Sequence, residues 1–398
     1  MNAKVLLSVS LTAACFVYAA GATLAEELDP RLKEFDISGL VRFETPQQAE
    51  AVRQRMVRFI WPNGLPATRP TVVPLDGHPA ELAAVDRSLV SKVERYDVDV
   101  SGFDFIQHSF AVFPKQPAEG APRLAVVHGG HMPEGPENYL IGGLDDTIEV
   151  LLKQGYVVAV VQMPLVTWND DTDGVLPSGT RFEVKGRATR GHDQLMAVTE
   201  PELEGAFLRF FLEEVVQVTN ELLATHEDPE IVLMIGLSGG GWTTHLSAAV
   251  DPRIDVSIPV AGSLPLYARP FSPGSKGDAE QEYAKLYREE DTDGDGVLDK
   301  ASGIASWLEI YALGGTSPDP KRPRLEVQVL NLYDTCCFGG TVYKTYGQSL
   351  TDRVAAIDTG RWSVYSDDSH RGHAISPVVI RKVLPKAIKE WKQLQEQQ

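Results

Sequence analysis

The residues best placed to do chemistry form the segment GLSGGG at positions 236–241, in which glycines flank Ser238. An apolar run over residues 231–235 precedes this segment and a helical pattern follows it, which predicts a strand, a sharp turn and a helix. Such a turn lifts a serine clear of the sheet, where its hydroxyl can act as a nucleophile. A structural glycine turn is the alternative interpretation.

Backbone donors are the next requirement, because a serine hydroxyl needs fixed N–H groups that receive the negative charge of the attacked carbonyl oxygen. We predict the N–H of Gly239 as one donor. The other should come from the loop HGGH at residues 128–131, where Gly129 and Gly130 allow the backbone to approach a carbonyl group. His131 flanks this loop, and we expect it to contact substrate.

An orienting acid should follow a later strand, in the chain order Ser, Asp, His. Asp334 is the first carboxylate after the strand predicted over residues 325–330, and we predict it as the acid. Asp367 and Asp368 are the rivals. They lie beyond the last predicted strand, where an ordinary loop turn explains them.

The base should be a histidine on the loop after the last strand, and the segment SHRGHAIS at residues 369–376 supplies two. We predict His373, because it follows a glycine and directly precedes the C-terminal helix. His370 is the alternative. With Ser238 and Asp334, such a base would complete a triad for acyl transfer.

Two aromatic residues near these positions, Trp242 and Tyr333, are predicted to line the substrate site, with a place in the core as the alternative for each. His245 lies on the helix expected after Ser238 and is interpreted as a packed core residue. The sequence has no His-x-x-x-His pair and no cysteine cluster with metal-ligand spacing. This argues against catalytic zinc, and we expect no cofactor for catalysis.

One acidic segment has the spacing of a calcium loop. The sequence DTDGDGVLD at residues 291–299 places carboxylates at loop positions 1, 3, 5 and 9 and glycine at position 6. The residue at position 12 is Ser302 rather than glutamate. Structural calcium is predicted here, with an acidic solvated loop as the alternative. Its ligands would be Asp291, Asp293, Asp295 and Asp299.

The N-terminal residues 1–25 read as a signal peptide: Lys4 is their only charged residue, an apolar run follows it, and small residues at 20–22 offer a cleavage site. We therefore expect an exported protein, periplasmic or secreted, with no membrane span once the signal is removed. A net charge of −18 argues against nucleic acid or anionic lipid as partners. Oligomeric state is left open.

Export would leave two thiols, since Cys15 belongs to the signal peptide. Cys336 and Cys337 are neighbours in the chain. Their α-carbons should lie ~3.8 Å apart, below the usual disulfide range, so a bond between them would close a strained ring. The sequence leaves open whether they are bonded.

Positioning these residues requires strands that alternate with helices. Short aliphatic runs separated by helical stretches begin at residue 124, a pattern typical of crossover units and a parallel sheet. Strands are predicted over residues 96–100, 103–113, 124–127, 156–162, 231–235, 254–260, 325–330 and 361–365. Helices are predicted over residues 45–60, 145–153, 202–223 and 240–249, on both faces of the sheet.

These motifs together resemble the α/β-hydrolase superfamily, particularly exported bacterial esterases akin to carbohydrate and dienelactone-type hydrolases. The resemblance implies an α/β-hydrolase fold, with a mostly parallel central sheet, and a small-molecule or polymer-borne ester as substrate. Residues 26–95 would form an N-terminal extension, and residues 96–398 the hydrolase domain with an inserted cap at about 263–322. A serine peptidase or amidase, and a non-catalytic binding protein, are the alternative functions.

Overall fold

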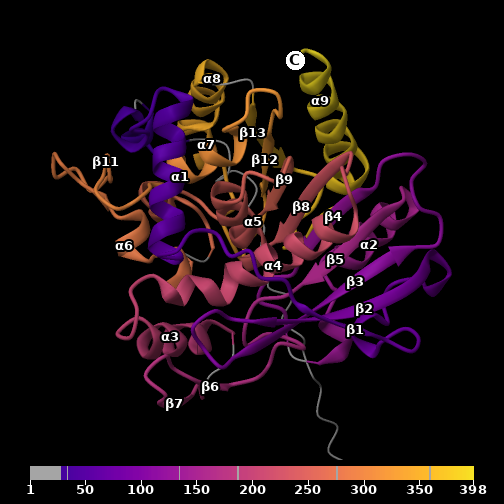
Figure 1. The fold of residues 1–398 in the computed structure, drawn as a ribbon. Coiled ribbons are helices and arrows are strands. Elements are labelled where there is room, and N and C mark those ends of the chain that lie inside the picture. The colour runs from indigo at the N-terminus through magenta and orange to yellow at the C-terminus, as the bar shows by residue number, and fades with distance from the viewer. Residues whose placement is uncertain (1–27, 34, 134, 186–187, 275–276, 358–359) are drawn as a thin grey trace, which may run out of the picture.

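The computed structural model describes residues 28–33, 35–133, 135–185, 188–274, 277–357 and 360–398 (Figure 1). The predicted signal peptide, residues 1–25, lies outside the described residues. A nine-stranded sheet forms the centre of the fold, and two small two-stranded sheets lie apart from it. Among the described helices, none combines the length and apolar character that crossing a membrane requires.

The elements of the central sheet and the helices around it have the following bounds. In spatial order the strands are β1 (Thr71–Pro74), β2 (Val90–Asp99), β3 (Ile106–Pro114), β5 (Tyr156–Val161), β4 (Arg123–His128), β8 (Ile231–Leu237), β9 (Val256–Val260), β12 (Leu325–Asn331) and β13 (Arg361–Asp367). The small sheets pair β6 (Asp173–Val175) with β7 (Arg181–Glu183), and β10 (Glu289–Glu290) with β11 (Lys300–Ala301). The α-helices are α1 (Pro46–Ile60), α2 (Leu144–Lys153), α3 (Ala188–Thr199), α4 (Arg209–Thr225), α5 (Gly239–Val250), α6 (Ala284–Tyr287), α7 (Trp307–Gly315), α8 (Gly347–Ile357) and α9 (Leu384–Glu396).

Strand direction divides the sheet into two parts. From β1 through β2 and β3 to β5 every pairing is antiparallel, and from β5 to β13 every pairing is parallel. Every residue of β5, β8 and β9 is buried, as parallel strands covered on both faces require. The predicted, mostly parallel sheet is confirmed.

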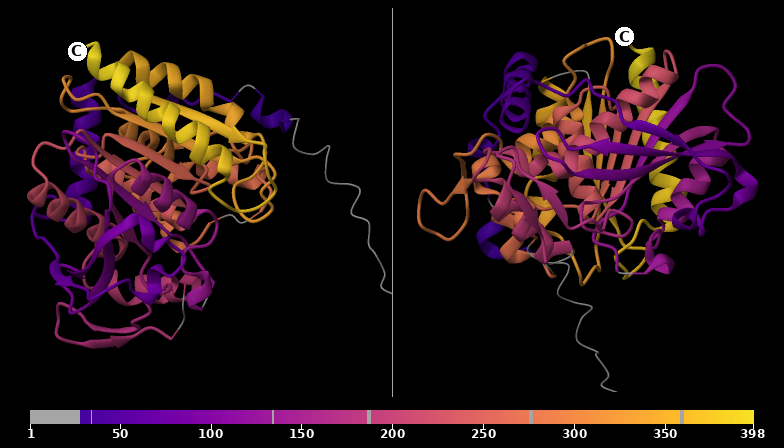
Figure 2. Two further views of the ribbon diagram at one scale, coloured as in Figure 1. Left: turned by 90° about the vertical axis from the view of Figure 1, so that its right-hand side faces the viewer. Right: turned by 60° about the horizontal axis from the view of Figure 1, so that its bottom comes forward.

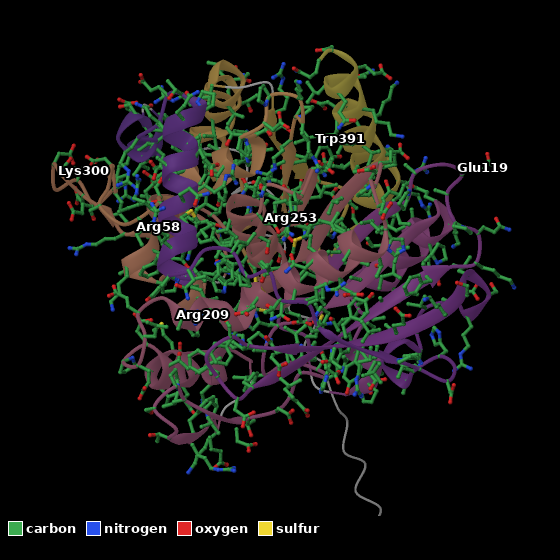
Figure 3. The ribbon with its side chains drawn as sticks, viewed as in Figure 1. Arg58, Glu119, Arg209, Arg253, Lys300 and Trp391 are labelled. Atoms are coloured by element: carbon green, nitrogen blue, oxygen red, sulfur yellow. A yellow bond between two sulfur atoms is a disulfide. The ribbon has the colours of Figure 1, made fainter. Side chains whose placement is uncertain are left out.

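Helices cover both faces of this sheet, as the sequence predicts (Figure 2). On one face, α2 and α9 share a hydrophobic cluster with β4, β8 and β12. On the other, α1, α4, α5, α7 and α8 share one hydrophobic cluster, and α4 also contributes to a second cluster with β4 and β8. Trp391 of α9 is 1% exposed, and its indole N–H donates to the carbonyl oxygen of Pro323 (Figure 3).

The helix predicted over residues 202–223 begins later than expected. Residues 201–205 form a turn, a 3₁₀ turn covers Ala206–Leu208, and α4 starts only at Arg209. Gly205 explains the late start, because its φ of 79° lies in the left-handed region and breaks a helix at that point. The predicted start of this helix at residue 202 is therefore wrong.

The chain before the parallel sheet packs closely onto it. Thr45 caps α1 by accepting a hydrogen bond from the Gln48 N–H at 3.3 Å. The buried Arg53 of this helix donates to backbone carbonyl groups near the ends of α5 and α7, among them Thr316 O at 3.0 Å. Helix ends present unpaired carbonyl groups, so a buried guanidinium satisfies them and is itself satisfied.

The stretch predicted as a cap, residues 263–322, divides into two parts. Its first part carries short 3₁₀ turns, α6 and the β10–β11 pair, and extends outward as far as Lys300 (Figure 3). Its second part contains α7, whose residues are all buried, and α7 packs with α5 against the sheet. The apolar sequence from Trp307 to Leu313 thus forms a crossover helix between β9 and β12 rather than part of a cap.

Candidate active site

Ser238 occupies the sharp turn between β8 and α5. Its φ of 59° and ψ of −123° are unusual for a residue with a side chain, and such strain is typical of a serine held on a nucleophile turn. Between Ile231 and Val250, all of it described, Ser238 is the one residue that is not buried. The fold therefore leaves the Ser238 residue partly exposed and buries the residues on either side of it in the chain.

The loop after β4 lies directly against this turn. His128 at the end of β4 pairs with Gly236 of β8, so both loops leave the sheet at the same level. A Cβ atom placed on Gly130 would lie 2.7 Å from the Gly239 nitrogen and 2.7 Å from Ser238 Cβ. Only glycine permits this approach, which brings the backbone of Gly130 to the nucleophile.

Gly129 does not have the role that the sequence predicts for it. Its N–H donates to Val161 O at 3.0 Å, so the prediction that Gly129 supplies an oxyanion donor does not hold in this structure. A side chain at Gly129 would instead collide with Gln162, whose side-chain oxygen would lie 2.2 Å from the added Cβ. The N–H groups of Gly130 and Gly239 remain as the candidate donor pair.

Gly130→Ala should lower kcat/KM by about 10²-fold or more, the usual loss when an oxyanion donor is displaced. The added Cβ would lie 2.6 Å from Leu237 O and close to the Gly239 nitrogen, so the backbone itself must shift. Steady-state kinetics on the purified variant measure this loss. Gly372→Ala is the control, because its Cβ meets only a His370 ring atom at 3.8 Å. Equal activity of the two variants would contradict the close approach.

His373 and Asp334 form the hydrogen-bonded pair that the sequence predicts for a base and its orienting acid. Nδ1 of His373 lies 2.6 Å from Oδ2 of Asp334, whose side chain is 1% exposed. Nε2 of His373 is buried and makes no hydrogen bond to a described residue. It is therefore the nitrogen left available for a serine hydroxyl.

Hydrogen bonds hold the loop that carries His373 beside the turn that carries Ser238. Asn331 Nδ2 donates to Ala374 O at 3.0 Å, and Ile375 N donates to Gly142 O at 2.8 Å. A Cβ on Gly142 would lie 2.7 Å from Leu237 and 3.6 Å from the carbonyl oxygen of His373. Gly142 thus lies between the residue before Ser238 and the predicted base, with no room for a side chain.

The rival residues His370 and Asp367 interact with each other instead. Nε2 of His370 lies 3.4 Å from Oδ2 of Asp367. Asp367 also accepts from the Ser369 N–H at 3.0 Å and from the Ser376 hydroxyl, and Ser376 in turn accepts from the Val379 N–H at 3.1 Å. Burial raises the pKa of Asp367, but hydrogen bonds from Ser369 and Ser376 outweigh burial and hold the pKa below its usual value. Asp367 therefore organises the start of the C-terminal helix, whose first turns, over residues 377–383, include a π-helical stretch (Val379–Val383) and lead into α9.

Cys336 and Cys337 are joined by a disulfide next to the predicted acid. Their backbone N–H groups donate to Oδ1 of Asp334 at 2.8 and 3.2 Å. The two sulfur atoms and a ring nitrogen of His373 all lie within 4.8 Å of one another. The cysteine turn thus fixes one oxygen of Asp334 and leaves the other to His373.

The residues predicted to contact substrate lie in three different settings. Trp242 is fully buried and packs edge-on against Phe211, so it belongs to the core behind the nucleophile helix, and its predicted substrate contact is wrong. Tyr333 is 37% exposed beside Asp334, with Arg371 over its ring. His131 lies beside the residue after Ser238, because its Cε1 would be 3.1 Å from a Cβ on Gly239.

His131 lies in a cluster with His192, Asp278 and Glu280, which the sequence did not predict. Nε2 of His131 lies 2.9 Å from Asp278 and 3.1 Å from Nδ1 of His192. Burial lowers the pKa of His131, but the hydrogen bond to Asp278 and the charge of Glu280 outweigh burial and raise the pKa overall. No motif links these residues, because they come from the loop after β4, from α3 and from the cap.

The predicted calcium loop brings three of its four carboxylates together. Asp291, Asp293 and Asp295 lie exposed, with one oxygen of each within 4.8 Å of the others. Asp299 instead accepts from the Thr292 hydroxyl at 2.7 Å. Backbone N–H groups of Gly296 and Gly294 lower the pKa of Asp291.

His128 should make the protein sensitive to acid. Burial lowers its pKa to about 4, despite its hydrogen bond to the Gly129 carbonyl oxygen. In the unfolded chain the pKa of this histidine is about 6.5. Between pH 6.5 and 4 the unfolded state therefore binds more protons than the folded state, and the free energy of unfolding falls as the pH falls. This residue should account for a loss of about 3 kcal/mol across that window.

Urea unfolding at pH 7.5 and 4.5 measures this effect. His128→Asn should show a smaller fall in the free energy of unfolding than the unmodified chain. His226→Asn, a half-buried histidine at the end of α4, should keep the full fall. Identical falls for all three proteins would contradict the assignment.

Comparison with known proteins supports the fold. No protein-family model and no curated protein sequence matches the chain. Among solved structures the chain is similar to methylesterase BT1017, with a TM-score of 0.51 and 14% identity over 87% of this chain; it spans 63% of that structure. It is also similar to acetyl xylan esterase 1 from Thermoanaerobacterium sp. JW/SL YS485, with a TM-score of 0.47 and 17% identity, covering 92% of this chain and 98% of the other.

The class of fold follows from the first likeness and from the sheet. A mostly parallel sheet, crossover helices on both faces and a strained serine turn between β8 and α5 are the features of an α/β-hydrolase. The chain has the α/β-hydrolase fold, and the predicted fold class is confirmed.

Proposed function

We propose that this chain is a serine hydrolase that cleaves a carboxylic ester through a covalent acyl-enzyme. The observation that carries the proposal is the position of Ser238, the one residue between Ile231 and Val250 that is not buried, on a strained turn against the Gly130 backbone. The His373–Asp334 pair lies on the loops next to this turn. These are the parts that an acyl-transfer site needs.

In the first half-reaction, Nε2 of His373 removes the Ser238 hydroxyl proton as Oγ attacks the ester carbonyl carbon. The N–H groups of Gly130 and Gly239 stabilise the oxyanion of the tetrahedral intermediate. Collapse of the intermediate breaks the bond to the alcohol oxygen, which takes the proton from His373. The carboxylate of Asp334 holds the ring in the required tautomer and stabilises the imidazolium.

In the second half-reaction, water replaces the alcohol. His373 removes a proton from the water molecule as its oxygen attacks the acyl carbon. The same two N–H groups stabilise the second oxyanion, and Ser238 leaves with the proton returned by His373. None of these steps uses a cofactor.

A substrate screen tests this proposal. The purified protein is assayed on short-chain esters, acetylated sugars, polymeric esters and matched amides and peptides, with Ser238→Ala as the blank. Ester turnover that exceeds amide turnover and vanishes in the blank is expected. Preferred cleavage of peptides or amides would point to the alternative reaction on the same triad, and no turnover of any class would favour a binding protein.

Export completes the proposal and rests on the predicted signal peptide. Expression of the full chain in a bacterium followed by mass spectrometry of the mature protein tests it. A mature chain that begins after Ala22 or Ala25 is expected. An intact N-terminus in the cell interior would contradict export.

Structural calcium is proposed for the loop at residues 291–299. The carboxylates of Asp291, Asp293 and Asp295 repel one another unless a hard cation binds between them. Adding Ca²⁺ to chelator-treated protein should therefore raise Tm by a few degrees, and Asp293→Asn should remove most of the rise. A Tm that does not respond to Ca²⁺ would exclude the calcium loop.

A further inference from the structure

Four side chains of metal-binding type converge beside the loop after β4. They are His131, His192, Asp278 and Glu280, and one ligand atom of each lies within 4.8 Å of all the others. His131 follows the glycine loop, His192 lies on α3, and the two acids belong to the cap. The cluster therefore joins three segments that are far apart in the sequence.

The spacing of the donor atoms matches a tetrahedral metal site. Nε2 of His131 lies 2.9 Å from Asp278 Oδ2, 3.1 Å from His192 Nδ1 and 3.4 Å from Glu280 Oε1. Nδ1 of His192 lies 3.7 Å from Glu280 Oε2. Zinc bonds of 2.0–2.2 Å in a tetrahedron separate neighbouring ligands by about 3.3–3.6 Å, within the range observed.

Glu280 provides a second, independent observation. Its side chain is fully buried, and neither carboxylate oxygen accepts a hydrogen bond from any residue that the structure describes. A buried carboxylate without hydrogen bonds is strongly unfavourable unless a cation compensates it. Both oxygens lie near the histidine nitrogens of the cluster, where a cation would be held.

His192 is oriented as a metal ligand. Its Nε2–H donates to Pro164 O at 2.8 Å, so in the neutral ring Nδ1 is the nitrogen without a proton, and it faces the cluster. Metal-binding histidines commonly donate their other ring N–H to such a partner, which fixes the tautomer.

Charge balance separates a metal site from an ion-pair cluster. Among the four residues themselves, a protonated His131 beside a neutral His192 supplies one positive charge against two carboxylates. A divalent cation with two neutral histidines balances both carboxylates. We propose that His131, His192, Asp278 and Glu280 bind one divalent transition-metal ion of the zinc type, which fastens the cap to the loop after β4.

The donor set indicates which ion binds and what it does. Calcium and magnesium take six or more oxygen ligands, whereas two imidazoles and two carboxylates suit zinc and its neighbours. Four protein ligands fill a tetrahedral site and leave no open position, so the ion is structural rather than catalytic. Because His131 lies against Gly239, loss of the ion should loosen the predicted oxyanion loop and the cap together.

Metal titration tests the proposal directly. Protein purified without metal-affinity resin and stripped with EDTA should bind one equivalent of Zn²⁺, with a rise in Tm of about 5 °C or more when the site is saturated. Co²⁺ should bind with the visible absorption of a tetrahedral complex. Absence of stoichiometric Zn²⁺ or Co²⁺ binding would overturn the proposal.

Glu280→Gln separates the metal site from an ion-pair cluster. The variant should bind Zn²⁺ at least about 100-fold more weakly, because it removes a direct ligand rather than a supporting group. In EDTA it should be at least as stable as the unmodified chain, since it removes an uncompensated buried charge, and with Zn²⁺ it should be less stable. A Tm lowered equally in EDTA and in Zn²⁺ would show that the four residues form an ion-pair cluster.

Two further variants complete the test. Asp278→Asn replaces Glu280→Gln if that variant does not fold, with the same loss of Zn²⁺ affinity expected. Asp293→Asn, in the separate acidic loop, should keep full Zn²⁺ stoichiometry. Loss of Zn²⁺ binding in Asp293→Asn, with binding kept in Asp278→Asn, would place the ion in the acidic loop and overturn the proposal.

Discussion

Ser238→Ala should lower kcat/KM for the ester substrate by about 10⁴- to 10⁶-fold, the loss usual when a nucleophilic serine is removed. The reason is that alanine offers no atom to form the acyl-enzyme, whatever the donors and base around it. The folded structure should persist, because Ser238 Oγ makes no hydrogen bond to a described residue and its backbone N–H bond to Val260 O is unaffected. Kinetics together with thermal unfolding measure both expectations.

Ser247→Ala is the matched control for this prediction. Ser247 lies on the same helix, is 1% exposed and has no hydrogen bond from its hydroxyl to a described residue. Its replacement should change kcat/KM by less than about 3-fold, as expected of a residue outside the site. If Ser238→Ala kept most of the activity, the nucleophile would have to be sought elsewhere.

The second large effect concerns the base. His373→Ala should lower kcat by about 10⁴-fold, because no other group would take the proton from the nucleophile. His370→Ala should retain activity within about 10-fold, since the contact of His370 with Asp367 lies outside the His373–Asp334 pair. The two histidines are three residues apart on one loop, so each variant controls for disturbance of that loop.

The corresponding acids extend this comparison. Asp334→Asn should also reduce kcat by about 10⁴-fold, since the amide would favour the wrong tautomer of His373. Asp367→Asn should act mainly on Tm, because Asp367 organises the start of the C-terminal helix through Ser376. Loss of activity in His370→Ala with activity kept in His373→Ala would reverse the assignment of the base.

The parallel sheet could be predicted from sequence because buried parallel strands appear as uninterrupted aliphatic runs. The segments that became β4, β5 and β8 are of this kind, and turn glycines or polar residues end each of them. The helix predicted over residues 45–60 is found as α1, and Thr45 caps it. The start of α4 was missed because a single left-handed glycine, Gly205, outweighed a helical pattern.

The site was partly predictable for the same reason. Ser238, Asp334 and His373 follow strands whose carboxyl ends meet at one edge of the sheet, so chain order alone brings them near each other. The direction of one N–H or one indole ring depends on packing from distant segments. That is why the sequence could not show that Gly129 is hydrogen-bonded to Val161 or that Trp242 packs on Phe211.

The cluster of His131, His192, Asp278 and Glu280 could not be predicted from local spacing in the sequence. Sequence spacing indicates a metal site only when ligands sit on one turn or one helix face. His131 and Glu280 meet because the cap folds back over the loop after β4, and this packing is specified by the whole cap. The absence of a metal-spacing motif argued against catalytic zinc, and it does not bear on a structural site built from separate segments.

The most direct test of the central claim is covalent labelling of the nucleophile. The purified protein is treated with a fluorophosphonate probe for active serines, digested, and the labelled peptide is located by mass spectrometry. One label per chain on Ser238, lost in Ser238→Ala and strongly slowed in His373→Ala, is the predicted result. A label on another residue, or labelling unchanged by Ser238→Ala, would contradict the account.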